Sequence, residues 1–229
     1  MTTQHQEPHE PGSQSPDTAP APRRSGFGRP ILAIAVVAAV AVVAFTLASR
    51  NTEAVAEVCE PAVDVVERLA PHARGQLAAV NVHTIPRLPP EMEFTGPDGE
   101  TLTLADFADR TILVNFWATW CAPCREEMPA LNTVQTEFGS EDFEVVAINV
   151  DTRNLDRPRA WLEEHGISEL RYFAENNGVL LQSLQRTGHV VGLPTTVIFG
   201  PQNCELAILR GYADWASEDA FRFLREALF

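Results

Sequence analysis

Residues 117–124, Trp117-Ala118-Thr119-Trp120-Cys121-Ala122-Pro123-Cys124, join an apolar run to a helical pattern. The apolar run, Thr111 to Phe116, predicts a buried strand, so the motif places a Cys-x-x-Cys pair at a helix N-terminus. Unpaired N–H groups and partial positive charge at a helix start favour a thiolate over a thiol at the first cysteine. We therefore expect Cys121 to attack in thiol–disulfide exchange and Cys124 to resolve the mixed disulfide that results.

The same two cysteines could form half of a zinc site. A structural zinc site needs four ligands, and the sequence has no second Cys-x-x-Cys and no histidine pair at ligand spacing. We therefore expect a redox dithiol, with no metal and no other cofactor. Pro123 lies in the first helical turn, where no backbone donor is needed, and fixes the turn between the two sulfurs.

The first fifty residues predict a tail followed by a membrane anchor. Residues 1–30 contain six prolines and hardly any aliphatic residue, so they cannot bury enough surface to fold. Ile31 to Ser49 carries no charge, and nineteen helical residues at about 1.5 Å each approach the hydrocarbon thickness of a bilayer. Three arginines precede this run and two glutamates soon follow Arg50, which predicts a cytoplasmic N-terminus and export of the remainder. A signal peptide cleaved at Ala54-Val55-Ala56 is the alternative, but the apolar run is long and starts late for one.

The part expected to be exported is acidic. After Arg50 it holds 13 arginines and 28 acidic residues, a net charge of −15, and the whole chain contains no lysine. Such a surface offers no basic groove for phosphates, so nucleic acid is not an expected partner. The absence of lysine also excludes Schiff-base catalysis.

The exported residues predict one α/β domain with a segment in front of it. About 180 residues follow Arg50, enough for a single core. Before the motif we expect an amphipathic helical segment from Glu53 to Ala79, an extended stretch from Ile85 to Pro90, and a hairpin from Phe94 to Leu102.

The elements expected after the motif alternate between strands and helices and end in a hairpin and a helix. They are the dithiol helix, strands at 143–150, 171–174, 195–199 and 206–209, and helices at 156–165 and 217–229, with Ser217 as N-cap. This order predicts a mixed sheet covered on both faces. The expected organisation is a tail (1–30), an anchor (31–49), a helical extension and linker (50–90) and a catalytic domain (91–229).

The motif and Gly192-Leu193-Pro194-Thr195-Thr196, about seventy residues later, together resemble the thioredoxin superfamily. Residues 113–117, 124–131, 143–150 and 215–220 resemble more narrowly the membrane-anchored TlpA thiol:disulfide interchange proteins. The resemblance implies a thioredoxin-like fold with an extra N-terminal helix, held in the periplasm by a single-pass anchor in the inner membrane. It also implies a protein-disulfide reductase that is regenerated by a membrane electron donor of the DsbD type. Its clients would include a copper chaperone and the copper subunit of cytochrome oxidase.

The resemblance extends to two features outside the motif. It implies a cis bond before Pro194, which would bring its loop close to the dithiol and leave the Leu193 backbone free to pair with a client strand. It also supports a structural disulfide between Cys59 and Cys204, which an even cysteine count in an oxidising compartment invites; two free buried thiols are the alternative. The residues expected to contact clients are Trp120, Ala122, Pro123 and Leu193.

Glu127 is the candidate proton shuttle. It lies three residues after Cys124, at the border of the buried helix face, where burial would raise its pKa. The alternative is a solvated carboxylate beside Glu126. Thioredoxins carry a buried acid on the strand before the motif, but Asn115 occupies that position here, which leaves Glu127 as the available carboxyl group.

Two other functions stay open. One is reduction of apocytochrome c during haem attachment, although the relatives with this role usually carry an acidic residue after the cis-proline, where this chain has Thr195. The other is a copper metallochaperone, since copper(I) accepts thiolate ligands. Copper-carrying relatives space their cysteines one residue wider and use a distant histidine, so we favour the reductase.

Overall fold

The computed structural model describes residues 36–45 and 58–228, which fall in two units, Met1–Ala48 and Ser49–Phe229. In the first unit, residues 36–45 are helical. No helix among the described residues combines the length and the apolar character needed to cross a bilayer. The predicted tail, both ends of the predicted anchor and the alternative cleavage site lie outside the described residues.

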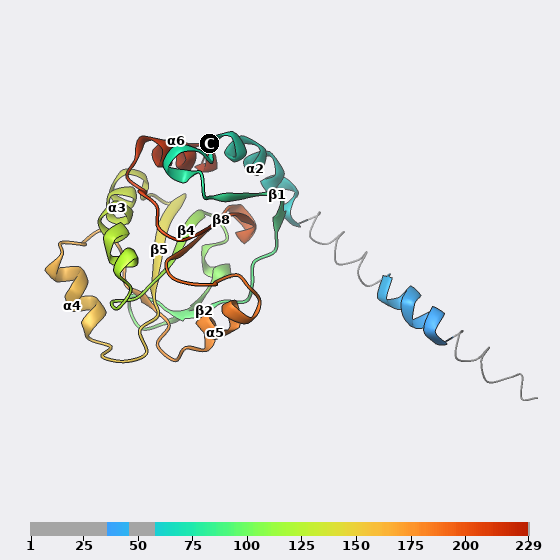
Figure 1. Ribbon diagram of the computed structural model, residues 1–229, viewed down its shortest axis with the longest axis horizontal. Coiled ribbons are helices and arrows are strands. Elements are labelled where there is room, and N and C mark those ends of the chain that lie inside the picture. The colour runs from blue at the N-terminus through green and yellow to red at the C-terminus, as the bar shows by residue number, and fades with distance from the viewer. Residues whose placement is uncertain (1–35, 46–57, 229) are drawn as a thin grey trace, which may run out of the picture. The chain divides into compact units, whose positions relative to one another are not determined.

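An eight-stranded mixed sheet forms the centre of the second unit (Figure 1). Its strands are β1 (Asn81–Arg87), β2 (Glu93–Thr95), β3 (Thr101–Thr103), β4 (Thr111–Trp117), β5 (Phe143–Asn149), β6 (Phe173–Ala174), β7 (Thr195–Phe199) and β8 (Glu205–Arg210). Across the sheet the order is β1-β8-β7-β4-β5-β6-β2-β3. Strand β4, which leads into the motif, is parallel to β5 and antiparallel to β7. The predicted mixed α/β sheet is confirmed, with the motif strand in its interior.

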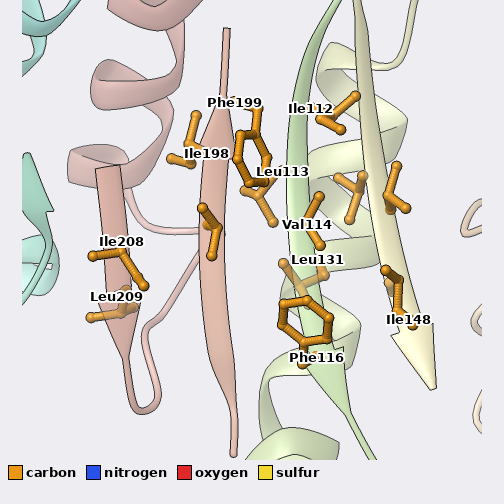
Figure 2. Packing of buried hydrophobic residues seen from close by; sticks show 14 of the residues in the cluster. Ile112, Leu113, Val114, Phe116, Leu131, Ile148, Ile198, Phe199, Ile208 and Leu209 are labelled. Atoms are coloured by element: carbon orange, nitrogen blue, oxygen red, sulfur yellow. The ribbon is translucent and has the colours of Figure 1, made fainter. Parts of the chain in front are cut away.

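Strands β4 and β5 are mostly apolar in sequence because they lie inside the sheet. All seven residues of each strand are buried, which requires cover on both faces. Figure 2 shows apolar side chains of β4, β5, β7 and β8 gathered across the four neighbouring strands. This packing holds the carboxyl end of β4 in place.

Five helices accompany the sheet among the described residues of the second unit: α2 (Val63–Leu69), α3 (Ala122–Phe138), α4 (Arg157–Glu164), α5 (Val179–Arg186) and α6 (Glu218–Leu228). The rings of Phe138 in α3 and Phe221 in α6 lie 5.4 Å apart, so these helices are neighbours. Helix α2 packs beside α6 (Figure 1). The hydroxyl of Ser217 accepts the Ala220 N–H at 3.2 Å and so caps α6.

The N-terminal extension is part of the sheet. Strand β1 pairs antiparallel with β8 and forms one edge of the sheet. The stretch from Ile85 to Pro90, predicted only as an extended linker, therefore begins inside this edge strand. A disulfide between Cys59 and Cys204 joins the start of the extension to the residue before β8. A polar contact also joins β1 to β8: the Nε2 atom of buried His83 in β1 lies 2.7 Å from Glu205 Oε1 in β8. The extension is therefore fastened by covalent and polar contacts.

Removal of the Cys59–Cys204 bond should destabilise the domain. The cysteines are 145 residues apart in sequence. In the chain-entropy model, a disulfide that closes a loop of this size stabilises the fold by up to about 5 kcal/mol, because it restricts the unfolded chain. The double variant Cys59→Ser/Cys204→Ser should therefore lower the Tm by about 5–15 °C. Calorimetry of the oxidised full chain in detergent measures this. An unchanged Tm would show that the bond does not constrain the unfolded chain.

Candidate functional site

The dithiol stands where the buried strand β4 turns into α3. The strand ends at Trp117 and the helix begins at Ala122, so Cys121 is the N-cap residue. Its sulfur accepts the Cys124 N–H at 3.3 Å, which meets one of the backbone donors that a helix start leaves unpaired. Cys121 and Cys124 are joined by a disulfide, with their Cα atoms 5.3 Å apart. The site is therefore described in its oxidised form.

The two sulfurs differ in accessibility. Cys121 is 6% exposed and Cys124 is completely buried, so only the Cys121 side can be approached from outside. Beside it, Trp120 is 66% exposed, and Ala122 and Pro123 also lie at the surface. This arrangement suits Cys121 to form an intermolecular bond and Cys124 to act from within the protein.

The loop before β7 lies at the same end of the sheet as the motif, because Thr195 pairs with Phe116 at the end of β4. The peptide bond between Leu193 and Pro194 is cis. The Thr195 hydroxyl donates to the Gly192 carbonyl at 2.7 Å and braces the loop. Leu193 is half-buried, and within the described ranges its N–H and C=O have no hydrogen-bond partner. These groups are free to pair with an extended client segment.

Glu127 lies inside the protein, further in than the border position that the helical pattern predicts. The Asn115 side chain donates to its Oε1 at 2.6 Å, and the Ala213 N–H donates to its Oε2 at 3.4 Å. Burial raises the pKa of Glu127 from 4.5 to about 7, while these two hydrogen bonds oppose part of the increase. The carboxyl group can therefore gain or lose a proton near neutral pH.

A short segment after β8 connects Glu127 to the cis-proline loop. The Gly211 N–H donates to the Pro194 carbonyl at 2.9 Å, and two residues later Ala213 donates to Glu127. Tyr212 stands between them and is half exposed. Residues 211–213 therefore contact both the cis-proline loop and Glu127.

Asp151 is a positioning residue that the sequence reasoning missed. Its carboxylate accepts the Thr119 N–H at 2.8 Å and the Thr119 hydroxyl at 3.1 Å, two residues before Cys121. The Asn149 side chain donates to the same carboxylate at 2.8 Å. A carboxylate directly after the buried strand at 143–150 was the available signal, because parallel neighbours β4 and β5 end at the same edge.

A mixed sheet, a Cys-x-x-Cys pair at a strand–helix junction and a cis-proline at the start of the neighbouring strand are the features of thioredoxin-like thiol–disulfide oxidoreductases. The chain belongs to the AhpC/TSA family, whose model matches residues 87–204.

The chain is similar to thioredoxin-like proteins and thiol-disulfide oxidoreductases of other bacteria. The chain is 43% identical over 60 residues to the thioredoxin-like protein YneN of Bacillus subtilis, which covers 26% of this chain and 35% of that protein. It is 25% identical over 122 residues to the thiol-disulfide oxidoreductase ResA of the same species, covering 53% of this chain and 65% of that protein. The chain thus spans about a third to two thirds of the length of these curated relatives. The chain also resembles a thioredoxin-family thiol:disulfide interchange protein from Chlorobium tepidum, which is known from a crystal structure. The two are 26% identical in sequence and superpose with a TM-score of 0.52, and the match covers 63% of this chain and 97% of that chain.

The buried Glu127 should make the oxidised protein less stable as the pH rises. Its pKa is about 7 in the native protein and ordinarily 4.5, so between these values the native state holds a proton that the unfolded chain has released. Because the native state binds more protons, raising the pH favours unfolding. The contribution of Glu127 protonation to the free energy of unfolding is complete below pH 4.5. About 3 kcal/mol of it should be lost by pH 8. Urea unfolding at a series of pH values measures the effect.

Two variants isolate this contribution from other titrating groups. Glu127→Gln should lose it, whereas Glu126→Gln, which changes an exposed carboxylate on the same helix, should keep the pH dependence of the unaltered protein. The same pH dependence in Glu127→Gln and in the unaltered protein would contradict the raised pKa.

Proposed function

We propose that the protein is a protein-disulfide reductase anchored in the inner membrane by residues 31–49, with residues 91–229 in the periplasm. The accessible Cys121 at the N-cap of α3, backed by the buried Cys124, is the observation that carries the activity. The uncharged run from Ile31 to Ser49 and the arginines before it support the anchor and its orientation.

The reaction is a two-step exchange of electrons between the dithiol and a client disulfide. The Cys121 thiolate attacks one client sulfur, forming a mixed disulfide and releasing the other client sulfur as a thiolate. Cys124 then attacks the Cys121 sulfur, which forms the intramolecular disulfide and releases the second client thiol. The client gains two electrons and two protons, and regeneration of the dithiol takes two electrons from a membrane donor of the DsbD type and two protons from solvent.

Glu127 takes the proton that the second step sets free. Cys124 must become a thiolate before it attacks, and Glu127 follows it by three residues on the buried face of α3. A carboxyl group with a pKa of about 7 is suited to accept a proton at neutral pH and to return it. Asn115 holds this carboxyl group in one orientation.

Clients dock on the exposed apolar side chains around the dithiol. Trp120, Val191 and Tyr212 are at least half exposed and belong to the motif, the cis-proline loop and the segment after β8. Aromatic and apolar surface residues of this kind supply much of the affinity in protein contacts. The likeness to TlpA proteins favours clients of copper-site assembly in cytochrome oxidase, namely a copper chaperone and the copper-binding subunit.

Single-cysteine variants of the full chain test the proposal. Cys124→Ser should accumulate a mixed disulfide with an oxidised client, because the resolving sulfur is missing, whereas Cys121→Ser should form none. Turnover of insulin disulfides should fall at least about a hundredfold in Cys121→Ser. Electrophoresis without reductant and mass spectrometry of the trapped client provide the readout.

The outcomes separate the competing functions. A trapped copper-binding protein supports the oxidase role, and a trapped apocytochrome c would move the function to haem attachment. Full insulin-reducing activity in Cys121→Ser would contradict a reductase that attacks through Cys121.

A further inference from the structure

The turn before the dithiol is held by two charged side chains. Ala118 accepts the Cys121 N–H at 3.1 Å, which closes a tight turn in front of α3. Within this turn, the Asp151 carboxylate accepts the Thr119 N–H at 2.8 Å and the Thr119 hydroxyl at 3.1 Å. The Arg125 guanidinium donates to the Thr119 carbonyl at 2.6 Å. Every polar group of Thr119 is therefore bound, and the backbone that leads to Cys121 is fixed.

Arg125 contacts the motif at two points. Its backbone N–H donates to the Cys121 carbonyl at 3.2 Å, and its side chain returns to the carbonyl of Thr119, which precedes it by six residues. The arginine thus ties the start of α3 to the loop in front of the helix. A hydrogen bond from a charged donor is stronger than one between neutral groups. This contact should therefore keep Cys121 in place when its disulfide is opened.

The charge of Arg125 is not compensated by a carboxylate. Within residues 58–228 Arg125 forms no ion pair, and the first turn of α3 contains no acidic residue. A cation near a helix start adds to the partial positive charge of the helix N-terminus, which by itself is unfavourable. Such an arrangement favours an anion at the N-cap, the position that Cys121 occupies.

Three acids adjoin the motif and oppose a thiolate there when they are ionised. Glu126 is exposed, so solvent and salt screen its charge. Glu127 has a pKa of about 7, so it is mostly protonated below neutral pH. Asp151 is buried, and its carboxylate accepts three hydrogen bonds. Asp151 is therefore the anion whose charge acts against that of Arg125 at the turn.

We propose that Arg125 is a positioning residue for the attacking cysteine. Its guanidinium fixes the turn before Cys121 through the Thr119 carbonyl, and its uncompensated charge favours the Cys121 thiolate once the disulfide is reduced. The role rests on the attack by Cys121 proposed above. It deepens that proposal, because a side chain outside the Cys-x-x-Cys motif then sets the reactivity of the motif.

Alkylation of Cys121 by iodoacetamide tests this role without a client. The thiolate displaces iodide and forms a carbon–sulfur bond, so the rate follows the thiolate fraction as the pH changes. Each variant is made in the full chain in detergent together with Cys124→Ser, which leaves one titrating thiol in the motif. Mass spectrometry measures the label on Cys121 over a series of pH values, and the midpoints of the rate profiles are compared.

The arginine variants test the hydrogen bond and the charge together. Arg125→Met removes both, so the midpoint should rise by about half a pH unit or more. Arg125→Lys keeps the charge and a donor, and its midpoint should return at least halfway to that of the Cys124→Ser parent. Arg186→Met, which changes an exposed arginine at the end of α5, should leave the midpoint unchanged.

Asp151→Asn separates the charge effect from a loss of structure. The amide oxygen can accept the Thr119 N–H and the Asn149 side chain, and the amide nitrogen can donate to the Thr119 hydroxyl. Only the negative charge is removed, so the midpoint should fall. A turn that was merely loosened would raise the midpoint in both Arg125→Met and Asp151→Asn, whereas the proposal predicts shifts in opposite directions.

Three results would each overturn the proposal: a midpoint in Arg125→Met equal to that of the parent, equal midpoints in Arg125→Lys and Arg125→Met, or a midpoint in Asp151→Asn that does not fall. If Arg125→Met does not fold, the Asp151→Asn result decides. The predicted alkylation profiles combined with a failure to reduce insulin would contradict the reductase and leave the role of Arg125 standing. The two proposals can therefore fail separately.

Discussion

The burial of β4 on both faces is the constraint on which the site depends. This strand is paired on both sides, and all seven of its residues are inside the protein. A shift of one residue would turn every side chain to the opposite face, so its register and its end at Trp117 are held firmly. The helix start that follows therefore has one position, and Cys121 occupies its N-cap. The same register sets Asn115 opposite Thr196 and brings Pro194 to the motif end of the sheet.

Around this junction the protein keeps polar groups that stability alone would not favour. Glu127 and Asn115 lie completely buried, and the Asn115 side chain serves both Glu127 and Thr196. Placing a carboxyl group among apolar residues costs free energy when it ionises, yet this cost is what moves its titration to neutral pH. Asp151 has a different role, because hydrogen bonds from Thr119 and Asn149 satisfy its carboxylate and hold the motif backbone. One buried acid is suited to proton transfer and the other to positioning.

The sequence predicted the centre of the fold better than its edges. The strands at 111–116, 143–150 and 195–199 are apolar because they are interior, so composition alone reveals them. Strand β1 exists because it pairs with β8, far away in the sequence. Only His83 and Pro86 of this strand are buried, so it shows neither the alternation of a half-buried strand nor an apolar run. Helix α5 has only eight residues, and its N-cap is a glycine that offers no side chain, so the local signals for it are weak.

The candidate site divides in the same way. The motif showed the dithiol directly, whereas the cis-proline and the Cys59–Cys204 pairing came from a family resemblance, since four cysteines allow three pairings. The full burial of Glu127 depends on the segment at 211–213, and the contact between Asp151 and Thr119 depends on two strands meeting at one edge. Such tertiary contacts leave no local pattern in a single sequence.

The reduction potential of the Cys121–Cys124 pair tests the central claim most directly, because it decides the direction of electron flow. The full chain in detergent would be equilibrated with glutathione redox buffers, and the oxidised fraction of this pair measured by thiol alkylation and mass spectrometry. A reductase predicts a potential of about −270 to −200 mV, as in thioredoxins and glutaredoxins. A potential near about −120 mV would make the pair an oxidant of client thiols and would contradict the proposed function.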